Sequence, residues 1–145
     1  YFAIDPILAG TSYTRHGGFI EDVDLFAAEF FSIRPAEAAS MDPQQRILLE
    51  LAHVAFSTTS VDEAQPPSLR AGVFIGQCNH DWFLCSRTLT QSAYGATGFS
   101  FSISSSRISY KLGLTGPSLT IDTACSSSLV ASDMALTSLK YGSSQ

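Results

Sequence analysis

Two short strand patterns separated by helical patterns constrain the fold of this chain most. The run AGVFIG (71–76) is apolar and bounded by glycines, which is typical of a buried strand. The run SLTIDT (118–123) alternates apolar Leu119 and Ile121 with polar residues and also predicts a strand. Helical patterns precede, separate and follow these strands, so the predicted order is helix, strand, helix, strand, helix. This order predicts an α/β fold class, in which helices cover a sheet in layers.

The clearest helical pattern is DPQQRILLELAHVAF, which begins at Asp42. Asp42 is a good N-cap, and Pro43 is favoured at the first helical position because its missing N–H group has no partner to lose there. The helical period predicts a buried face made of Ile47, Leu48, Leu51, Val54 and Ala55. A second pattern runs from Ala124 to about Tyr141, where Gly142 is a natural stop. Its predicted buried face consists of Leu129, Val130, Met134 and Leu139.

Two segments are less regular. Residues 21–40 mix aromatic and acidic side chains, which predicts short helical turns. The side chains expected to point inward there are Leu25, Phe26, Phe30 and Phe31. In segment 98–114, Phe99, Phe101 and Ile103 alternate as they would in a strand. In the same segment, Phe101, Ile108 and Leu112 fit one face of a helix, so periodicity leaves both structures open and favours the helix.

The composition is that of a globular protein. The 145 residues suffice for one domain, and 45% of them are hydrophobic against 14% charged. The net charge of −5 and the scattered lysines and arginines argue against nucleic-acid binding. No apolar run approaches the roughly 20 residues that a membrane-spanning helix needs. The chain starts at Tyr1 without a methionine, and we interpret it as part of a longer protein.

Three cysteines, Cys78, Cys85 and Cys125, form no dense disulfide framework. Their odd number fits free thiols in a reducing compartment. Cys78, His80 and Cys85 suggest a metal site, but their spacing matches no standard zinc pattern and a fourth ligand is missing. We therefore interpret them as packing residues and expect no bound metal.

The segment DTACSSSL (122–129) places Cys125 where a predicted helix directly follows a strand. At such a position the helix dipole favours the thiolate, which is the nucleophilic form. The amides of the first helical turn lack intrahelical acceptors and can bind a developing oxyanion. The small serines allow a substrate to approach, and their hydroxyls can satisfy local backbone groups. Cys125 is thus a candidate nucleophile. The alternative is a small buried hydrophobic residue, the usual role of a free cysteine.

The segment GPSLTIDTACSSSLVA, taken as a whole, resembles the active-site signature of the β-ketoacyl synthase family, in its polyketide synthase and type I fatty acid synthase branch. The upstream block RHGGFIEDVDLFAAEFFSIRPAEAASMDPQQRILLE resembles the same family, as do AGVFIG and RISYKLGLTGP. The resemblance covers about Tyr13 to Gly142. It departs from the family at LAHVAFSTTS, SSSRISY and CNHDWF, which leaves the branch and the substrate preference open.

The resemblance implies a thiolase-like fold of two similar layered α/β/α halves. Residues 1–145 would then be a partial ketosynthase domain: most of the N-terminal half, lacking the first strand and the whole C-terminal half. It also implies that 98–114 is a helix leading into the second strand. The family's two catalytic histidines would lie beyond Gln145, since none of His16, His53 and His80 matches their motifs. The fragment alone is therefore expected to be inactive.

The implied activity is that of a 3-oxoacyl-[acyl carrier protein] synthase of polyketide or fatty acid biosynthesis. Cys125 would accept an acyl group and then release it to a malonyl-type extender in a decarboxylative Claisen condensation. The expected partners are acyl carrier protein, acyl and malonyl-type thioesters, and a second copy in a homodimer. No cofactor is expected to be bound, since the phosphopantetheine arm belongs to the visiting carrier protein.

Two alternatives stay open. The first is a non-catalytic ketosynthase-like dimer partner, although such relatives usually lack the cysteine. The second is a cysteine hydrolase in which His80 would assist Cys125, but neither the caspase nor the papain signature occurs. Among other residues, Asp42 and Arg46 are expected to fix a helix start and a surface ion pair. Asp122 is a candidate orienting or turn-stabilising acid, and Trp82 a core or interface residue.

Overall fold

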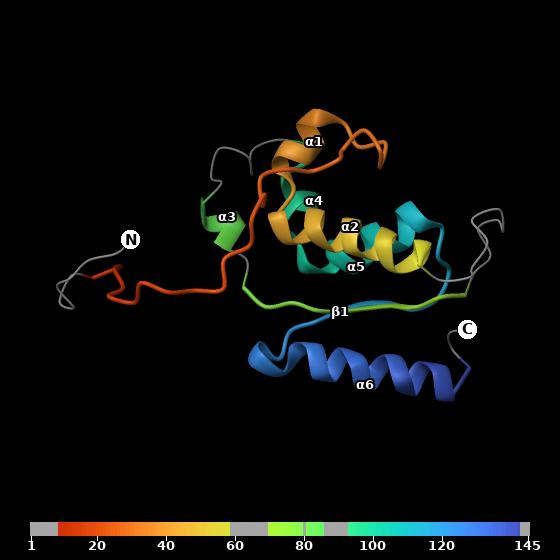
Figure 1. The fold of residues 1–145 in the computed structure, drawn as a ribbon. Coiled ribbons are helices and arrows are strands. Elements are labelled where there is room, and N and C mark those ends of the chain that lie inside the picture. The colour runs from red at the N-terminus through yellow and green to blue at the C-terminus, as the bar shows by residue number, and fades with distance from the viewer. Residues whose placement is uncertain (1–8, 59–69, 80, 86–92, 143–145) are drawn as a thin grey trace.

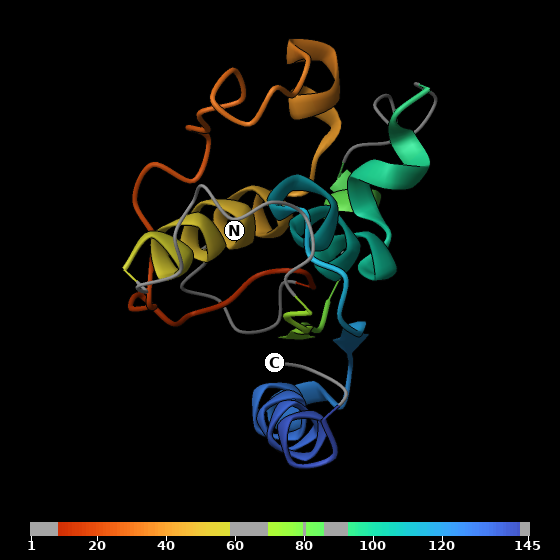
Figure 2. The same cartoon turned by 90° about the vertical axis from the view of Figure 1, so that its right-hand side faces the viewer.

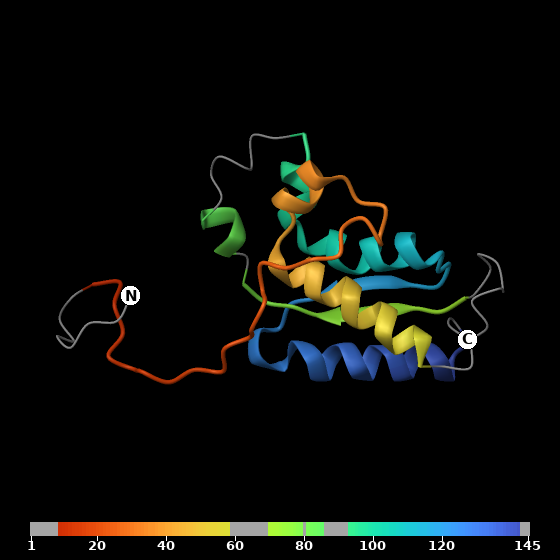
Figure 3. The ribbon, with the colours of Figure 1, turned by 45° about the horizontal axis from the view of Figure 1, so that its top comes forward.

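The computed structural model describes residues 9–58, 70–79, 81–85 and 93–142. Within these ranges the sheet has two parallel strands, β1 (Val73–Gly76) and β2 (Ser118–Ile121), with Val73 opposite Ser118 and Gly76 opposite Ile121. Helices α2 (Pro43–Ser57) and α5 (Phe101–Leu112) cover one face of the sheet, and α6 (Ser127–Lys140) covers the other (Figures 1 and 3). Figure 2 shows α6 end-on, separated by the strands from the helices of the other layer. The predicted layered α/β arrangement and both predicted strands are confirmed.

In the described parts of the crossover between the two parallel strands there are three helices. These are α3 (Asp81–Cys85), α4 (Gly95–Phe99) and α5. Ser100 has extended backbone angles, φ −70° and ψ 130°, and separates α4 from α5. α5 ends at Gly113, whose φ of 66° is left-handed and suits glycine. The helical interpretation of 98–114 is confirmed, with a break that the periodicity did not reveal.

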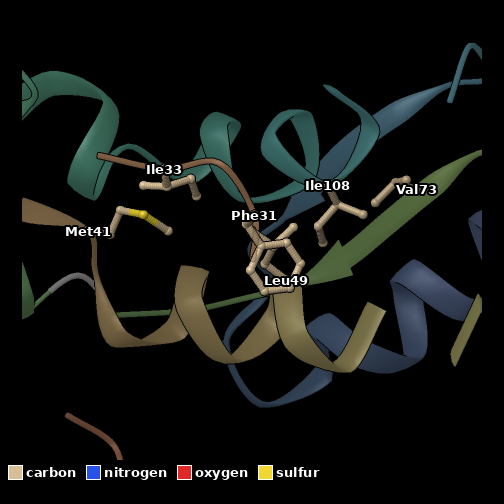
Figure 4. Close-up of a cluster of buried hydrophobic side chains, with 6 residues drawn as sticks. All are labelled: Phe31, Ile33, Met41, Leu49, Val73 and Ile108. Atoms are coloured by element: carbon tan, nitrogen blue, oxygen red, sulfur yellow. The ribbon is translucent and has the colours of Figure 1, made fainter. Parts of the chain in front are cut away.

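The hydrophobic core lies between α2, α5, β1 and the segment that leads into α1 (Pro35–Ser40) (Figure 4). Its buried members are Phe31, Ile33, Met41, Leu49, Val73 and Ile108. The ring of Phe26 stacks on that of Phe31 at 5.5 Å between centroids. The prediction that Phe26 and Phe31 point inward is confirmed, as are the short helical turns. Leu25 and Phe30 are exposed, so their predicted burial is wrong.

The predicted buried face of α2 is partly wrong. Leu51, Val54 and Ala55 are exposed, whereas Gln45 and Leu49 are buried. Burial of the polar Gln45 is possible because its side chain is fully engaged with polar partners. Its Nε2 donates to the carbonyl oxygens of Thr97 and Ser100, and its Oε1 accepts from Arg107. Hydrophobicity alone therefore predicts the wrong buried face for α2. Of the residues predicted to be buried there, Leu48 is partly buried against the core.

The predicted buried face of α6 is also wrong. Leu129, Met134 and Leu139 are exposed, and Val130 is half-buried. The buried residues of this helix are small: Ser127, Ala131 and Ser138. Small side chains allow close contact with the sheet, and Gly76 of β1 shows how close it is. A Cβ added at Gly76 would lie 2.5 Å from the carbonyl carbon of Ser127, so only glycine fits there.

Within the described ranges, no helix combines the length and the apolar character that crossing a membrane requires.

Candidate active site

Cys125 lies between the end of β2 and the start of α6. The chain leaves β2 at Ile121 and forms a single 3-10 turn, η2 (Ala124–Ser126), before α6 begins at Ser127. The Cys125 thiol is free and exposed. This placement confirms the predicted strand-to-helix junction, while the exposure contradicts the alternative of a small buried hydrophobic residue.

The residue before the thiol has a strained backbone. Ala124 has a φ of 54°, in the left-handed region that L-residues other than glycine, asparagine and aspartate rarely adopt. The N–H of Ala124 donates to Oδ1 of Asp122 at 3.0 Å. Asp122 therefore stabilises the turn, as one of its two predicted roles required. A sharp turn of this kind presents a side chain away from the strand and the helix on either side of it.

The serine hydroxyls next to Cys125 satisfy backbone groups of the same turn. Ser126 Oγ donates to the carbonyl oxygen of Thr123 at 2.8 Å and lies 2.9 Å from its Oγ1. Ser127 Oγ donates to the carbonyl oxygen of Ala124 at 2.7 Å and accepts from the N–H of Thr123 at 2.9 Å. The predicted role of these hydroxyls is confirmed. The turn is held from inside by side chains that leave Cys125 uncovered.

The carboxyl ends of both strands meet at the edge where Cys125 lies. The N–H of Gln77, the residue after β1, donates to the carbonyl oxygen of Ile121 at 3.1 Å and extends the pairing to this edge. Ligands of open α/β sheets bind in the crevice outside the carboxyl ends of the strands. A thiol at this edge is therefore in a position to react with a bound substrate.

Asp42 caps α2 as predicted, with Oδ1 accepting from the N–H of Gln44 at 2.8 Å. Burial raises the pKa of Asp42 above its ordinary value. The predicted surface ion pair of Arg46 is not formed with any described residue. Arg46 instead donates to the carbonyl oxygen of Asp24 at 3.4 Å and lies over the ring of Trp82, 5.7 Å from its centroid. Trp82 is half-buried and donates from Nε1 to the carbonyl oxygen of Ser40.

The remaining singled-out residues do not gather around Cys125. Cys78 is half-buried and accepts from Nδ2 of Asn79 at 3.7 Å. His53 lies on α2, across the sheet from α6, and its ring packs edge-on against the ring of Phe30. His80 and the side chain of Cys85 lie outside the described residues. Among the residues that are described, no three His, Cys, Asp or Glu side chains come together as a metal site would require.

Sequence reasoning missed two contributors to this site, Gly76 and the left-handed Ala124. A glycine at the end of a strand pattern is a signal of close backbone approach, and Gly76 could have been singled out on that ground. Alanine carries no signal for a left-handed backbone.

An exposed cysteine on a strand-to-helix turn, at the carboxyl edge of a parallel sheet, is the arrangement expected of an α/β protein that uses a cysteine nucleophile. The chain belongs to the β-ketoacyl synthase family: the family model "Beta-ketoacyl synthase, N-terminal domain" matches residues 1–145. The family resemblance of the sequence is thereby confirmed.

Similar proteins are polyketide synthases. Polyketide synthase GfsA of Streptomyces halstedii is 46% identical over 146 residues, which cover 97% of this chain and 2% of the relative. Erythronolide synthase EryA2 of Saccharopolyspora erythraea is 45% identical over 144 residues, covering 97% of this chain and 4% of the relative. The chain thus spans only a few per cent of the length of these relatives.

Similar solved structures are ketosynthases. The ketosynthase from module 6 of the bacillaene synthase of Bacillus subtilis 168 has a TM-score of 0.72 at 36% identity, over 86% of this chain and 20% of that one. The oxazolomycin ketosynthase domain OzmH KS7 of Streptomyces albus JA3453 has a TM-score of 0.75 at 32% identity, over 96% of this chain and 25% of that one. The fold is therefore the thiolase-like α/β fold of ketosynthases, of which this chain covers a part.

Proposed function

We propose that residues 1–145 form most of the N-terminal half of a ketosynthase domain that carries out chain extension in polyketide biosynthesis. The observation that carries this proposal is the exposed Cys125 on its turn at the carboxyl edge of the sheet. Membership of the family and the similarity to polyketide synthases support it. Fatty acid synthesis uses the same chemistry and differs in the product.

The first half-reaction loads Cys125. Its sulfur attacks the carbonyl carbon of an acyl thioester, a C–S bond to Cys125 forms, and the carrier's thiol leaves with a proton. The N–H of Cys125 contributes one donor to the oxyanion hole of the tetrahedral intermediate. The second donor and the two catalytic histidines belong to the part of the domain beyond residue 145.

The second half-reaction extends the chain. A malonyl-type thioester loses carbon dioxide, and the resulting enolate carbon attacks the acyl carbon held on Cys125. The C–S bond to Cys125 breaks, the thiol is regenerated, and a 3-oxoacyl thioester remains on the carrier. The chain needs no bound cofactor for these steps, since the phosphopantetheine arm arrives on acyl carrier protein. The complete domain acts as a homodimer.

The test uses the complete ketosynthase domain with an acyl-carrier-protein thioester. Wild-type protein should gain one acyl group on Cys125, seen by mass spectrometry, and should form 3-oxoacyl product once malonyl carrier protein is added. Cys125→Ala should do neither. Because Cys125 is exposed, its removal should change the free energy of unfolding by no more than about 0.5 kcal/mol.

Cys78→Ala is the matched control, since it removes the half-buried thiol and should keep both activities. Condensation that persists in Cys125→Ala would contradict the assignment of the nucleophile. A wild-type domain that neither loads nor condenses would instead support a non-catalytic dimer partner.

A further inference from the structure

Ser127 is the buried member of the serine run after Cys125. Its exposed fraction is 4%, whereas Ser126 and Ser128 are exposed. Its hydroxyl makes two hydrogen bonds inside the turn, accepting from the N–H of Thr123 and donating to the carbonyl oxygen of Ala124. The hydroxyl therefore bridges the two backbone groups on either side of the left-handed residue.

The second of these bonds restrains the orientation of the Cys125 amide. The carbonyl group of Ala124 and the N–H group of Cys125 belong to one peptide unit, which is planar and trans. The two groups therefore point in opposite directions. When Ser127 Oγ binds the carbonyl oxygen at 2.7 Å, it turns the N–H of Cys125 away from itself.

The turn needs such a restraint because its backbone is strained. A left-handed conformation costs an alanine about 1–2 kcal/mol. The φ of 54° at Ala124 therefore persists only where surrounding bonds hold it. The carbonyl oxygen of Ala124 accepts two bonds, one from the backbone N–H of Ser127 and one from its hydroxyl. With the first bond alone, the peptide between Ala124 and Cys125 is held less firmly and can re-aim the amide.

The position of Ser127 is itself set by the sheet. A Cβ added at Gly76 would lie 2.5 Å from both the carbonyl carbon of Ser127 and the nitrogen of Ser128, and 2.7 Å from the carbonyl oxygen of Ser127. The start of α6 thus rests directly on the end of β1. The Ser127 hydroxyl connects this fixed point to the turn that carries the thiol.

We propose that Ser127 is a positioning residue that aims the N–H of Cys125 at the oxygen of the thioester carbonyl during acyl loading. The inference rests on the proposed function of Cys125. Ser127 does not touch the substrate, and it acts through the Ala124–Cys125 peptide.

The experiment compares Ser127→Ala with wild type in the complete ketosynthase domain. Complete loss of an oxyanion donor lowers rates by about 100-fold. Ser127→Ala keeps the backbone bond to Ala124, so its acyl loading should slow by between about 10-fold and about 100-fold. The KM for the carrier-protein thioester should not change. Alkylation of Cys125 by iodoacetamide, which develops no oxyanion, should change less than about threefold, and the thermal midpoint should stay within a few degrees.

Ser128→Ala is the matched control, because the Ser128 hydroxyl is exposed and binds no described residue. It should load at the wild-type rate. Ser127→Thr keeps the hydroxyl and should load within about tenfold of wild type, which separates loss of the hydrogen bonds from a change at a buried position.

Wild-type loading by Ser127→Ala would overturn the positioning role and leave Cys125 as the nucleophile. Equal losses of loading and alkylation would also overturn it, since they would show a general disturbance of the turn. Should Ser127→Ala fail to fold, Ser127→Thr decides alone: a folded variant that has lost loading contradicts the proposal. If the wild-type domain does not load Cys125, that result contradicts the proposed function itself and not only the role of Ser127.

Discussion

At the scale of a single residue, Asp42 caps helix α2 but is buried, which disfavours its charged form. Its exposed fraction is 2%, and its carboxylate accepts from the backbone N–H and the side-chain amide of Gln44. Burial raises the pKa of Asp42 above its ordinary value. The two bonds from Gln44 and the charge of Arg46 act against this rise, and the charge of Asp81 adds to it. Relative to the unfolded chain, folding therefore shifts Asp42 toward its protonated form.

The raised pKa predicts the direction in which stability depends on pH. A carboxyl whose folded pKa lies above its unfolded pKa stabilises the fold at low pH, and this contribution is lost as pH rises through the folded pKa. Asp42→Asn removes the titration and keeps an oxygen that can accept from the N–H of Gln44. In the complete domain, the stability of wild type relative to Asp42→Asn should fall as pH rises from acidic to neutral.

Urea unfolding of the two proteins at a series of pH values measures this difference, and only the difference matters because other groups titrate in both. A difference that stays constant, or that grows in favour of wild type toward neutral pH, would contradict the prediction.

At this scale, the position of a residue within a local pattern was predictable. The place of Cys125 at a strand-to-helix junction and the cap at Asp42 were predicted correctly, since a thiol after a strand and a cap before a proline are local patterns. The left-handed Ala124 was not predictable, because alanine does not favour that conformation. The bridge made by Ser127 follows from that backbone, and so it became visible only in the structure.

At the scale of elements, Arg107 of α5 holds together the layer that covers one face of the sheet. The exposed fraction of its side chain is 8%. Its guanidinium donates to Glu37 of α1, Gln45 of α2 and the carbonyl oxygen of Thr97 in α4. Two residues earlier in α5, Ser105 is joined to Thr120 of β2 by two hydrogen bonds. The network thus connects α1, α2 and α4 to the helix that packs on the strand leading to Cys125.

Removal of Arg107 should be costly for this reason. Arg107→Met leaves the carboxylate of Glu37 and the amide oxygen of Gln45 without their partner, and loss of one member of a buried pair typically destabilises by about 3 kcal/mol. Arg34→Met removes the same charge from an exposed position and should change stability by less than about 0.5 kcal/mol. Urea unfolding of the complete domain measures both values.

A double-mutant cycle with Glu37→Gln completes this comparison. The double variant should lose less stability than the sum of the two single variants, because the second change removes the stranded carboxylate. Equal costs for Arg107→Met and Arg34→Met would contradict a linking role of the network.

The same elements show why helix existence was easier to predict than helix orientation. The caps and periods of α2 and α6 located both helices correctly. Their buried faces were misassigned, because α2 buries the polar Gln45 toward Arg107 and α6 buries small residues against Gly76. Both choices depend on partners distant in sequence, which a local hydrophobic pattern does not contain.

At the scale of the whole molecule, α6 packs one face on the sheet and exposes large apolar side chains on the other. Its small residues pack on the sheet, while Leu129, with an exposed fraction of 75%, and Leu136 lie on the outer side. Residues seven positions apart lie on the same side of a helix, so these two leucines share one exposed side of α6, called the α6 stripe, with the polar Ser132 and Asp133 between them. Large apolar side chains exposed together on one side of a helix often mark a surface that packs against another part of a protein. The chain spans 20% and 25% of two similar ketosynthase chains, and the rest of such a domain is the natural cover for this stripe.

The last prediction therefore concerns residues 1–145 produced alone. With the α6 stripe in water, the fragment should aggregate or remain partly unfolded, because large exposed apolar patches promote association. Leu129→Glu combined with Leu136→Glu should raise its soluble fraction, measured by size-exclusion chromatography. The control, Ser132→Glu with Thr137→Glu, adds the same charge to exposed positions of α6 without removing apolar surface, and should help less. None of the three forms should make 3-oxoacyl product from acyl and malonyl carrier-protein thioesters, since the proposed function places the two catalytic histidines outside these residues. A monodisperse wild-type fragment that condenses over many turnovers would show that the catalytic groups lie within these 145 residues.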